Sequence, residues 1–323
     1  MPETLLSVRD LKVHFPSKGA VVRAVDGVSF DIAAGETLGL LGESGCGKTT
    51  LGRTILRLQR ATSGEVLYRG RPIGEDARPF RRHIQMIFQD PYASLDPRMT
   101  VESIIAEPIR ALGLAHNGGA TPRVERLMDL VGLSKRFASR YPHEFSGGQR
   151  QRIGIARALA AEPDLIVADE PISALDVSIQ AQILNLLERL RDELKLSYLL
   201  ISHDLRAVGR IADRIAVMYL GKMVELAPAG KLYSRPLMPY TKALVSSLPV
   251  IGEAPVRERV VLTGDVPSPL KPPSGCHFRT RCSYAIPECA ESTPQLQEIE
   301  QDHWAACSRI GPEHPEIGEP IRR

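Results

Sequence analysis

Hydrophobic and polar positions follow two different patterns along the chain. Short apolar runs predict β-strands, and runs without polar residues predict strands buried on both faces. These runs lie at residues 5–8, 25–32, 37–41, 84–88, 165–168, 198–201 and 215–218. Between several of them, apolar residues recur every three or four positions and predict helices over residues 48–58, 101–112, 121–131, 148–161 and 178–194. Short apolar strands that alternate with helices predict an α/β fold around a largely parallel, buried sheet.

The pattern changes after about residue 236. Prolines recur between Pro249 and Pro273 while the periodicity fades, which predicts a linker, and a cysteine-bearing segment follows. We therefore expect one large domain over residues 1–236 and a smaller extension over residues 237–323. No internal repeat is visible in the sequence, which favours a single α/β unit over a tandem pair.

Composition and charge narrow the class of protein. The chain has 323 residues, of which 43% are apolar and 24% are charged, a composition that excludes a disordered chain. Its net charge of +3 is too small to favour nucleic acid as a partner. No apolar run approaches the roughly 18 residues of a spanning helix, and the N-terminus lacks the features of a signal peptide. We expect a soluble cytoplasmic chain that contacts a membrane only through a protein partner.

A glycine-rich segment lies between the strand predicted at 37–41 and the helix predicted at 48–58. Residues 42–49, Gly-Glu-Ser-Gly-Cys-Gly-Lys-Thr, fit the pattern G-x-x-x-x-G-K-[ST]. Glycines let the backbone N–H groups curl around nucleotide phosphates, Lys48 neutralises phosphate charge, and the Thr49 hydroxyl binds Mg²⁺. Cys46 is interpreted as a small loop residue and not as a redox site. The predicted nucleotide contacts here are Gly42, Ser44, Gly45, Cys46, Gly47, Lys48, Thr49 and Thr50.

Two adjacent carboxylates end the apolar run at 165–168. They are Asp169 and Glu170. Adjacent side chains point to opposite sides of an extended chain, so one carboxylate can serve a metal while the other serves a nucleophile. We expect Asp169 to hold Mg²⁺ and Glu170 to polarise the attacking water.

A Ser-Gly-Gly turn opens the helix predicted at 148–161. Ser146, Gly148 and Gln149 lie in this turn. A helix N-terminus with free N–H groups and a Ser hydroxyl is a second anion site. One nucleotide does not need two such sites, so the pattern predicts a head-to-tail dimer in which this turn covers the nucleotide of the other subunit.

Taken in order, these segments resemble an ATP-binding-cassette (ABC) ATPase over about residues 5–235. The order is the phosphate-binding loop, Gln89, the Ser-Gly-Gly-Gln turn, the Asp-Glu pair, a run ending in Asp176, and His203. The resemblance implies an α/β P-loop fold with a RecA-like parallel sheet core, an antiparallel β subdomain and a helical signature subdomain. It also implies that the bound nucleotide is ATP with Mg²⁺, and that the chain hydrolyses it.

The resemblance assigns roles to further residues. Gln89 senses Mg²⁺ and the nucleophilic water and links the site to a membrane subunit. Asp176 lies in the loop that crosses the dimer, and His203 contacts the γ-phosphate. Phe15 stacks on adenine, at a position where the family usually has Tyr. Glu170 and His203 match the family pattern, which favours a hydrolysing subunit over a regulatory, non-hydrolysing one.

Other segments resemble the second (F-type) ATPase subunit of the oligopeptide and dipeptide importer family. They are residues 84–91, 93–98, 140–146 and 174–178 and, in the extension, 239–244 and 272–282. The resemblance implies that the chain energises peptide uptake from the cytoplasmic face of the cell membrane. It implies as partners a sister ABC ATPase, two membrane permeases and an external substrate-binding protein.

Two alternative functions stay open. The same ATPase role for nickel or another small solute is one, because relatives of the peptide importers carry nickel. A soluble ABC ATPase outside transport is the other, although this chain has neither tandem cassettes nor a long coiled-coil insertion.

Four cysteines gather in the extension. Cys276, Cys282, Cys289 and Cys307 have the spacing C-x5-C-x6-C-x17-C, in a segment too short to bury much core. A bound metal would supply folding energy, and four thiolates suit either a [4Fe–4S] cluster or tetrahedral Zn²⁺. Zinc sites more often contain a close C-x₂₋₄-C pair, and resemblance to importer ATPases with a cluster in this extension favours iron–sulfur. Unligated thiols or disulfides are the third alternative.

Overall fold

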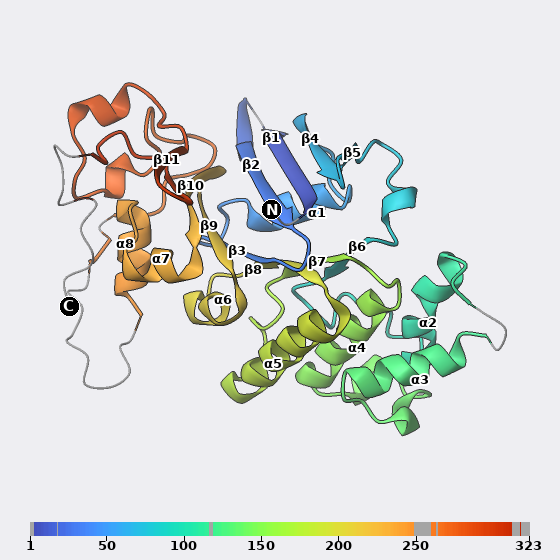
Figure 1. Cartoon of the computed structure of the whole chain (residues 1–323). Helices are drawn as coiled ribbons and strands as arrows, with labels where there is room; N and C mark the ends of the chain where they lie inside the picture. The colour runs from blue at the N-terminus through green and yellow to red at the C-terminus, as the bar shows by residue number, and fades with distance from the viewer. Residues whose placement is uncertain are drawn as a thin grey trace.

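The computed structural model describes residues 3–17, 19–115, 119–248, 260–262, 264–311 and 317. Two sheets, a group of helices and a folded C-terminal extension make up this part of the chain (Figure 1). Residues 249–259 and 263 of the predicted linker lie outside the described residues.

A large mixed sheet forms the centre of the described structure. Its strand order is β11-β12-β10-β9-β3-β8-β7-β6. Strands β9, β3, β8, β7 and β6 pair in parallel, and the neighbours from β9 through β10 and β12 to β11 pair antiparallel. The predicted buried parallel sheet is thus confirmed. The strands are β3 (Thr37–Leu41), β6 (Ile84–Ile87), β7 (Leu165–Asp169), β8 (Ser197–Ile201), β9 (Arg214–Tyr219), β10 (Lys222–Pro228), β11 (Gln297–Glu300) and β12 (His303–Ala305).

A second, antiparallel sheet has the order β2-β1-β4-β5 and lies against the upper side of the core in Figure 1. Its strands are β1 (Thr4–Ser17), β2 (Ala20–Ala33), β4 (Ser63–Tyr68) and β5 (Arg71–Pro72). The sequence pattern indicated only residues 5–8 for the first strand. The pairing of β1 with β2 changes register several times, and each shift breaks the alternation of apolar and polar positions by which a strand is recognised.

The helices of the described residues contribute to two hydrophobic cores. The described helices are α1 (Lys48–Ile55), α2 (Val101–Ala111), α3 (Thr121–Leu130), α4 (Gly147–Leu159), α5 (Val177–Leu194), α6 (Leu205–Ile211), α7 (Ala229–Ser234) and α8 (Pro239–Ser246). Helix α1 packs through Leu51 and Ile55 into a core shared with the antiparallel sheet, whereas α2 to α5 bury their apolar faces in a second core. Helix α1 ends before the predicted residue 58, where Arg57 has a left-handed backbone (φ 56°).

The predicted extension folds back onto the central sheet and adds strands to it. Strand β12 pairs with β10, with Trp304 opposite Leu226, and β11 lies outside β12. Glu225 of β10 is fully buried at this junction, and its carboxylate lies 2.7 Å from Nε2 of His303. The same carboxylate accepts hydrogen bonds from the backbone N–H groups of Leu237 and Met238, at 2.7 and 2.9 Å. One buried carboxylate therefore joins the last core strand, the start of the extension and its terminal hairpin.

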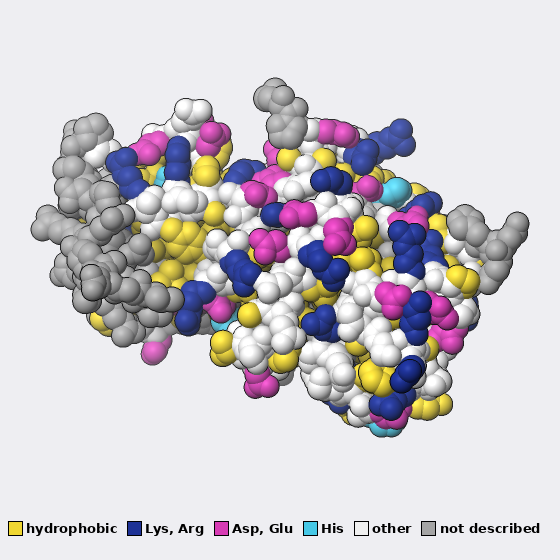
Figure 2. All heavy atoms as spheres, turned by 60° about the horizontal axis from the view of Figure 1, so that its bottom comes forward, with side chains coloured by type: hydrophobic (Ala, Val, Ile, Leu, Met, Phe, Trp, Pro, Cys, Tyr) yellow, Lys and Arg dark blue, Asp and Glu magenta, His cyan; other side chains and the backbone are white. Residues whose placement is uncertain are grey.

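The surface carries mixed charges. On the face shown in Figure 2, Lys and Arg side chains are interspersed with Asp and Glu. None of the helices in the described ranges combines the length and the apolar character that crossing a membrane requires.

Replacement of Glu225 tests the junction. Glu225→Ala is expected to lower the free energy of unfolding by about 3 kcal/mol, because buried donors lose their acceptor. Chemical unfolding at neutral pH measures the loss. Glu291 is exposed on the same extension. Its variant Glu291→Ala is the matched control and is expected to stay within about 0.5 kcal/mol of the parent chain. Equal stability of the two variants would contradict the role given to Glu225.

Candidate nucleotide and metal sites

The glycine-rich loop packs closely against the backbone at Ala24 and at Met218. It leaves β3 at the carboxyl end of the sheet and enters α1 at Lys48. Gly47 has φ 108°, and a Cβ there would lie 1.9 Å from the carbonyl oxygen of Ala24. A Cβ on Gly42, with φ 156°, would lie 2.4 Å from the carbonyl oxygen of Met218. The glycines of the motif are therefore required by backbone conformation and by space, as the sequence predicts for a loop that curls tightly.

Lys48 is buried at the centre of this loop. Its Nζ donates hydrogen bonds to the carbonyl oxygens of Gly42 at 2.8 Å and Glu43 at 3.1 Å. Cys46 is also buried, with Sγ 3.9 Å from the Lys48 ammonium. Burial raises the pKa of the Cys46 thiol, which keeps it protonated and poorly reactive. This agrees with its interpretation as a small loop residue.

Thr49 and Asp169 meet between α1 and β7. The Thr49 hydroxyl donates to a carboxylate oxygen of Asp169 at 3.0 Å. Burial raises the pKa of the Asp169 carboxyl, and the hydrogen bond from Thr49 opposes that rise only in part. The pair places a hydroxyl and a buried carboxylate, both hard oxygen ligands of the kind Mg²⁺ prefers, at one point of the sheet edge.

Gln89, Glu170 and His203 converge on the same edge, each just after a strand. Gln89 Nε2 donates to Glu170 Oε2 at 3.2 Å, and His203 Nδ1 lies 3.1 Å from Glu170 Oε1. Glu170 has φ 44°, a left-handed conformation that costs energy for a residue with a side chain. The structure thus brings together the three residues that sequence reasoning selected as catalytic, 114 positions apart at the extremes (203 − 89).

The Ser-Gly-Gly turn lies elsewhere in the fold. Ser146 is the N-cap of α4: its hydroxyl accepts from the Gln149 N–H at 3.4 Å, and its own N–H donates to the Gln149 side chain at 3.0 Å. A Cβ on Gly148 would lie 2.5 Å from a methyl carbon of Ile179, so α4 and α5 can approach only with glycine there. Helix α4 packs into the core opposite that of α1 (Figure 1). Within one chain, this turn and the phosphate-binding loop therefore belong to different faces of the sheet.

Two other predicted site residues lie at the margins. Phe15 is half-buried in β1, opposite Val22 of β2. Asp176 is exposed and stands as the N-cap of α5, directly beside Val177, whose exposed fraction is 81%.

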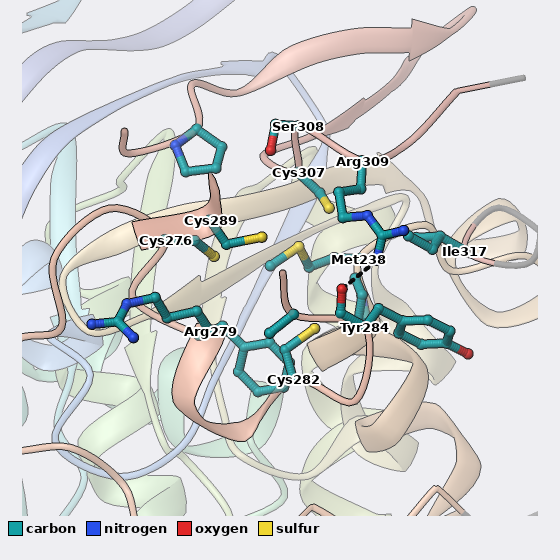
Figure 3. Close-up of a pocket in the computed structure, with 14 residues that line it drawn as sticks. Met238, Cys276, Arg279, Cys282, Tyr284, Cys289, Cys307, Ser308, Arg309 and Ile317 are labelled. Carbon is teal, nitrogen blue, oxygen red and sulfur yellow. Dashed lines mark hydrogen bonds between the residues drawn. The ribbon is translucent and has the colours of Figure 1, made fainter. Parts of the chain in front are cut away.

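The four extension cysteines line one small cavity. Figure 3 shows their sulfurs around it, with Met238 among them. The cavity has a volume of about 20 Å³, which is room for about one water molecule. Burial raises the pKa of Cys276, Cys307 and Cys282, the last to about 11, and charge on neighbouring thiolates adds to the effect. The described residues contain no group of three or more His, Cys, Asp or Glu arranged to hold a metal ion. The four predicted cysteine ligands thus lie around one cavity, but the described residues do not form a metal-binding arrangement.

Sequence reasoning did not select Glu43, Tyr240 or Arg281, which meet at the phosphate-binding loop. The N–H of Glu43 donates to the Tyr240 hydroxyl, 197 positions away, and its carboxylate pairs with Arg281, 238 positions away. No local pattern signals a pair at such separations, because each residue taken alone is an ordinary loop or helix residue.

Comparison with known proteins agrees with this geometry. A family model described as ABC transporter matches residues 25–173, and one described as Oligopeptide/dipeptide transporter, C-terminal region, matches residues 224–289. The dimeric post-hydrolysis structure of the ATP-binding cassette MJ0796, bound to ADP and Pi, is similar with a TM-score of 0.64 and 28% identity. The similarity covers 70% of this chain and 99% of that one.

Curated relatives match over nearly the full length. The putative oligopeptide transport ATP-binding protein YkfD of Bacillus subtilis is 58% identical, over 94% of both chains. The oligopeptide transport ATP-binding protein OppF of Salmonella typhimurium is 49% identical, over 96% of this chain and 97% of its own. With an ABC cassette, the oligopeptide/dipeptide C-terminal region and relatives of this similarity, the chain belongs to the ATP-binding proteins of the ABC transporter family.

Proposed function

We propose that this chain is the ATP-hydrolysing subunit of an ABC importer that drives uptake of dipeptides and oligopeptides. The observation that carries the proposal is the convergence of Gln89, Glu170 and His203 beside the Thr49–Asp169 pair. A carboxylate that could take a proton, a metal-binding pair and a phosphate-binding loop at one sheet edge are the parts that phosphoryl transfer to water needs.

The phosphate-binding loop is the proposed binding site of the nucleotide phosphates. Its N–H groups would surround the phosphates while Lys48 turns from loop carbonyls to phosphate oxygens. Thr49, Gln89 and Asp169 are the proposed Mg²⁺ ligands, and Phe15 is the proposed adenine contact. When bound, Mg²⁺ would neutralise charge that develops on the phosphate oxygens. The further proposed loop contacts are Gly42, Ser44, Gly45, Cys46, Gly47 and Thr50.

Hydrolysis is proposed to centre on Glu170. Its carboxylate takes a proton from a water whose oxygen forms a bond to the γ-phosphorus while the bond from that phosphorus to the ADP oxygen breaks. His203 contacts the γ-phosphate and Gln89 orients the water, both already within reach of the Glu170 carboxylate. The products are ADP and inorganic phosphate.

The site is proposed to be completed by a second cassette. Ser146, Gly148, Gln149 and Asp176 would close over the nucleotide of the partner, which is a sister ABC ATPase in a heterodimer. Support comes from their place on the face opposite α1. The MJ0796 cassette, whose structure resembles this one, is dimeric.

Contact with two membrane permeases is proposed on a groove beside Gln89. The groove has a volume of about 210 Å³ and is lined by Leu58, Phe80 and Phe88, among others. Leu58 is 57% exposed there, and the strand β6 leads from this groove to Gln89. A permease segment seated in it would sense the state of the hydrolytic site. The chain is accordingly proposed to lie at the cytoplasmic face of the membrane, with an external substrate-binding protein on the other side.

Peptide is the proposed cargo. Relatives at 58, 53 and 49% identity are named oligopeptide transport ATP-binding proteins, and the matched C-terminal region is described as that of an oligopeptide/dipeptide transporter. Transport of nickel or another small solute would use the same ATPase chemistry and is the alternative that an uptake assay separates.

The extension cysteines are proposed to hold a metal centre. A [4Fe–4S] cluster is favoured by the spacing without a close pair, whereas the small cavity favours a single Zn²⁺. Four half-buried thiols that line one cavity fit either group, because a cation stabilises the thiolate form that burial disfavours at Cys276, Cys282 and Cys307. The expected role is structural: metal binding supplies folding energy to a segment with little core of its own.

Glu170→Gln tests the hydrolytic proposal. The assembled transporter is expected to bind ATP but to lose about 10²-fold or more in turnover, and to lose ATP-driven peptide uptake with it. Phosphate release and uptake of labelled dipeptide by proteoliposomes measure the two losses. Glu162→Gln, which makes the same change at an exposed position, is the control and is expected to retain both turnover and uptake. Undiminished turnover in Glu170→Gln would contradict the role of Glu170 as base.

Asp169→Asn tests whether the buried carboxylate of Asp169, a proposed Mg²⁺ ligand, lowers the stability of the folded chain. Because the folded-state pKa of Asp169 is raised, its ionised form opposes folding at neutral pH. Without nucleotide or Mg²⁺, the Asn variant is expected to be more stable than the parent at about pH 7.5, and the gain is expected to shrink as the pH falls toward about 4, the ordinary pKa of Asp. Denaturant unfolding at several pH values measures this. Asp192→Asn, on an exposed site, is expected to show no such gain.

Metal content tests the cysteine proposal. The anaerobically purified full chain is expected to show a broad absorption band near about 400 nm and about four irons and four sulfides per chain. Stoichiometric zinc in a colourless protein would move the assignment to Zn²⁺, and the absence of both metals would contradict a metal centre. Cys282→Ser is expected to lose the metal, while Cys46→Ser, in the phosphate-binding loop, is expected to keep it.

A further inference from the structure

The extension reaches the phosphate-binding loop through one ion pair. Arg281 Nη1 lies 2.8 Å from Glu43 Oε2, and Arg281 Nη2 lies 3.1 Å from Glu43 Oε1. The guanidinium thus contacts both carboxylate oxygens, the paired geometry of the stronger charge-assisted hydrogen bonds. The Arg281 side chain is only 8% exposed and that of Glu43 is 25% exposed. The pair is therefore shielded from solvent, unlike an ordinary surface ion pair.

Glu43 is held on three sides. Its N–H donates to the Tyr240 hydroxyl at 3.0 Å, and its carbonyl oxygen accepts from the Lys48 ammonium at 3.1 Å. Its side chain accepts from Arg281. Two of these three contacts come from residues beyond the predicted cassette boundary. The second residue of the loop is thus positioned largely by the extension.

Arg281 is itself fixed by the cysteine-bearing segment. It ends the short helical turn Arg279–Arg281 and directly precedes Cys282. Phe278, one turn earlier, is 2% exposed and packs on Tyr219 and Tyr240, with ring centroids 5.3 and 5.4 Å away. The backbone of Arg281 is therefore anchored by the buried ring of Phe278 before it and by the cavity-lining Cys282 after it, which holds its side chain near the loop.

We propose that Arg281 is a positioning residue for the phosphate-binding loop, through which the folded cysteine-bearing extension sets the affinity of the site for ATP. The inference rests on the proposed nucleotide site and adds to it a residue outside the cassette. Arg281 acts through Glu43 and is not expected to touch the nucleotide.

Two physical effects make this contact matter. Arg281 compensates the negative charge of Glu43, which otherwise stands in the loop that receives a polyanion. It also fixes the loop before the nucleotide arrives, so less ordering is left to oppose binding. Removal of Arg281 alone leaves the Glu43 carboxylate unpaired and takes away one of the three contacts that hold this residue, and both changes weaken ATP binding.

A double-mutant cycle between Arg281 and Glu43 tests the proposal. The full-length variants are Arg281→Met, Glu43→Gln and the pair combined, with the ATP dissociation constant, KM and kcat as readouts. Arg281→Met is expected to weaken ATP binding about tenfold and to raise KM, with little change in kcat. Adding Glu43→Gln to Arg281→Met is expected to recover most of the loss, because the uncompensated carboxylate is gone. Arg281→Lys is expected to lie between the parent chain and Arg281→Met.

Arg279→Met is the matched control. Arg279 lies in the same helical turn, but it donates hydrogen bonds to Ser274 of the extension. This variant is expected to bind ATP as the parent does. Hydrogen exchange of loop residues 42–48 is expected to speed up in Arg281→Met and not in Arg279→Met, which separates a local effect on the loop from unfolding of the extension.

Three results are decisive. Equal ATP affinity in Arg281→Met and Arg279→Met would overturn the proposal, and so would a loss in Arg281→Met that Glu43→Gln leaves unchanged. Lys48→Ala serves as the reference for the site itself. If ATP binds the parent and Lys48→Ala equally well, the proposed nucleotide site fails, a result distinguishable from failure of the Arg281 proposal alone.

Discussion

The turn that joins β3 to α1 is the constraint on which the rest of the structure depends. It passes so close to the backbone at Ala24 and Met218 that a single added Cβ at Gly47 or Gly42 would collide with a carbonyl oxygen. Ala24 lies in the antiparallel sheet and Met218 in the central sheet. The loop is therefore the point at which both sheets and the first helix are fitted together, and its shape cannot relax without moving all three.

The proposed catalytic and metal-binding residues lie along the sheet edge at which this turn begins. Parallel strands end at a common edge, so the residues that follow β6, β7 and β8 arrive near the loop although they are far apart in sequence. Gln89, Glu170 and His203 meet in this way, and Asp169 meets Thr49. Two features that cost folding free energy lie at this sheet edge. Glu170 has a left-handed backbone, and the buried carboxyl of Asp169 has a raised pKa.

Much of this could be predicted from the sequence, for identifiable reasons. The buried strands are short apolar runs, and the loop motif fixes which strand and helix it joins. Bulges in β1 hide its length, and the hairpin β11–β12 is too short and polar to stand out. The cysteine spacing predicts that four thiols gather, but not the cavity they line. The pairing of Arg281 with Glu43 depends on how the extension folds back, through contacts of Phe278 with Tyr219 and Tyr240 and of Glu225 with His303.

The central claim is that ATP is held between two cassettes and that the extension stays docked on the loop that receives it. A structure of the assembled transporter with ATP bound tests it most directly. The account predicts ATP phosphates within hydrogen-bond distance of Lys48 on this chain and of the Ser-Gly-Gly turn on the opposing cassette, with Arg281 still paired to Glu43. ATP held entirely by one chain, or bound with the extension detached from the loop, would contradict it.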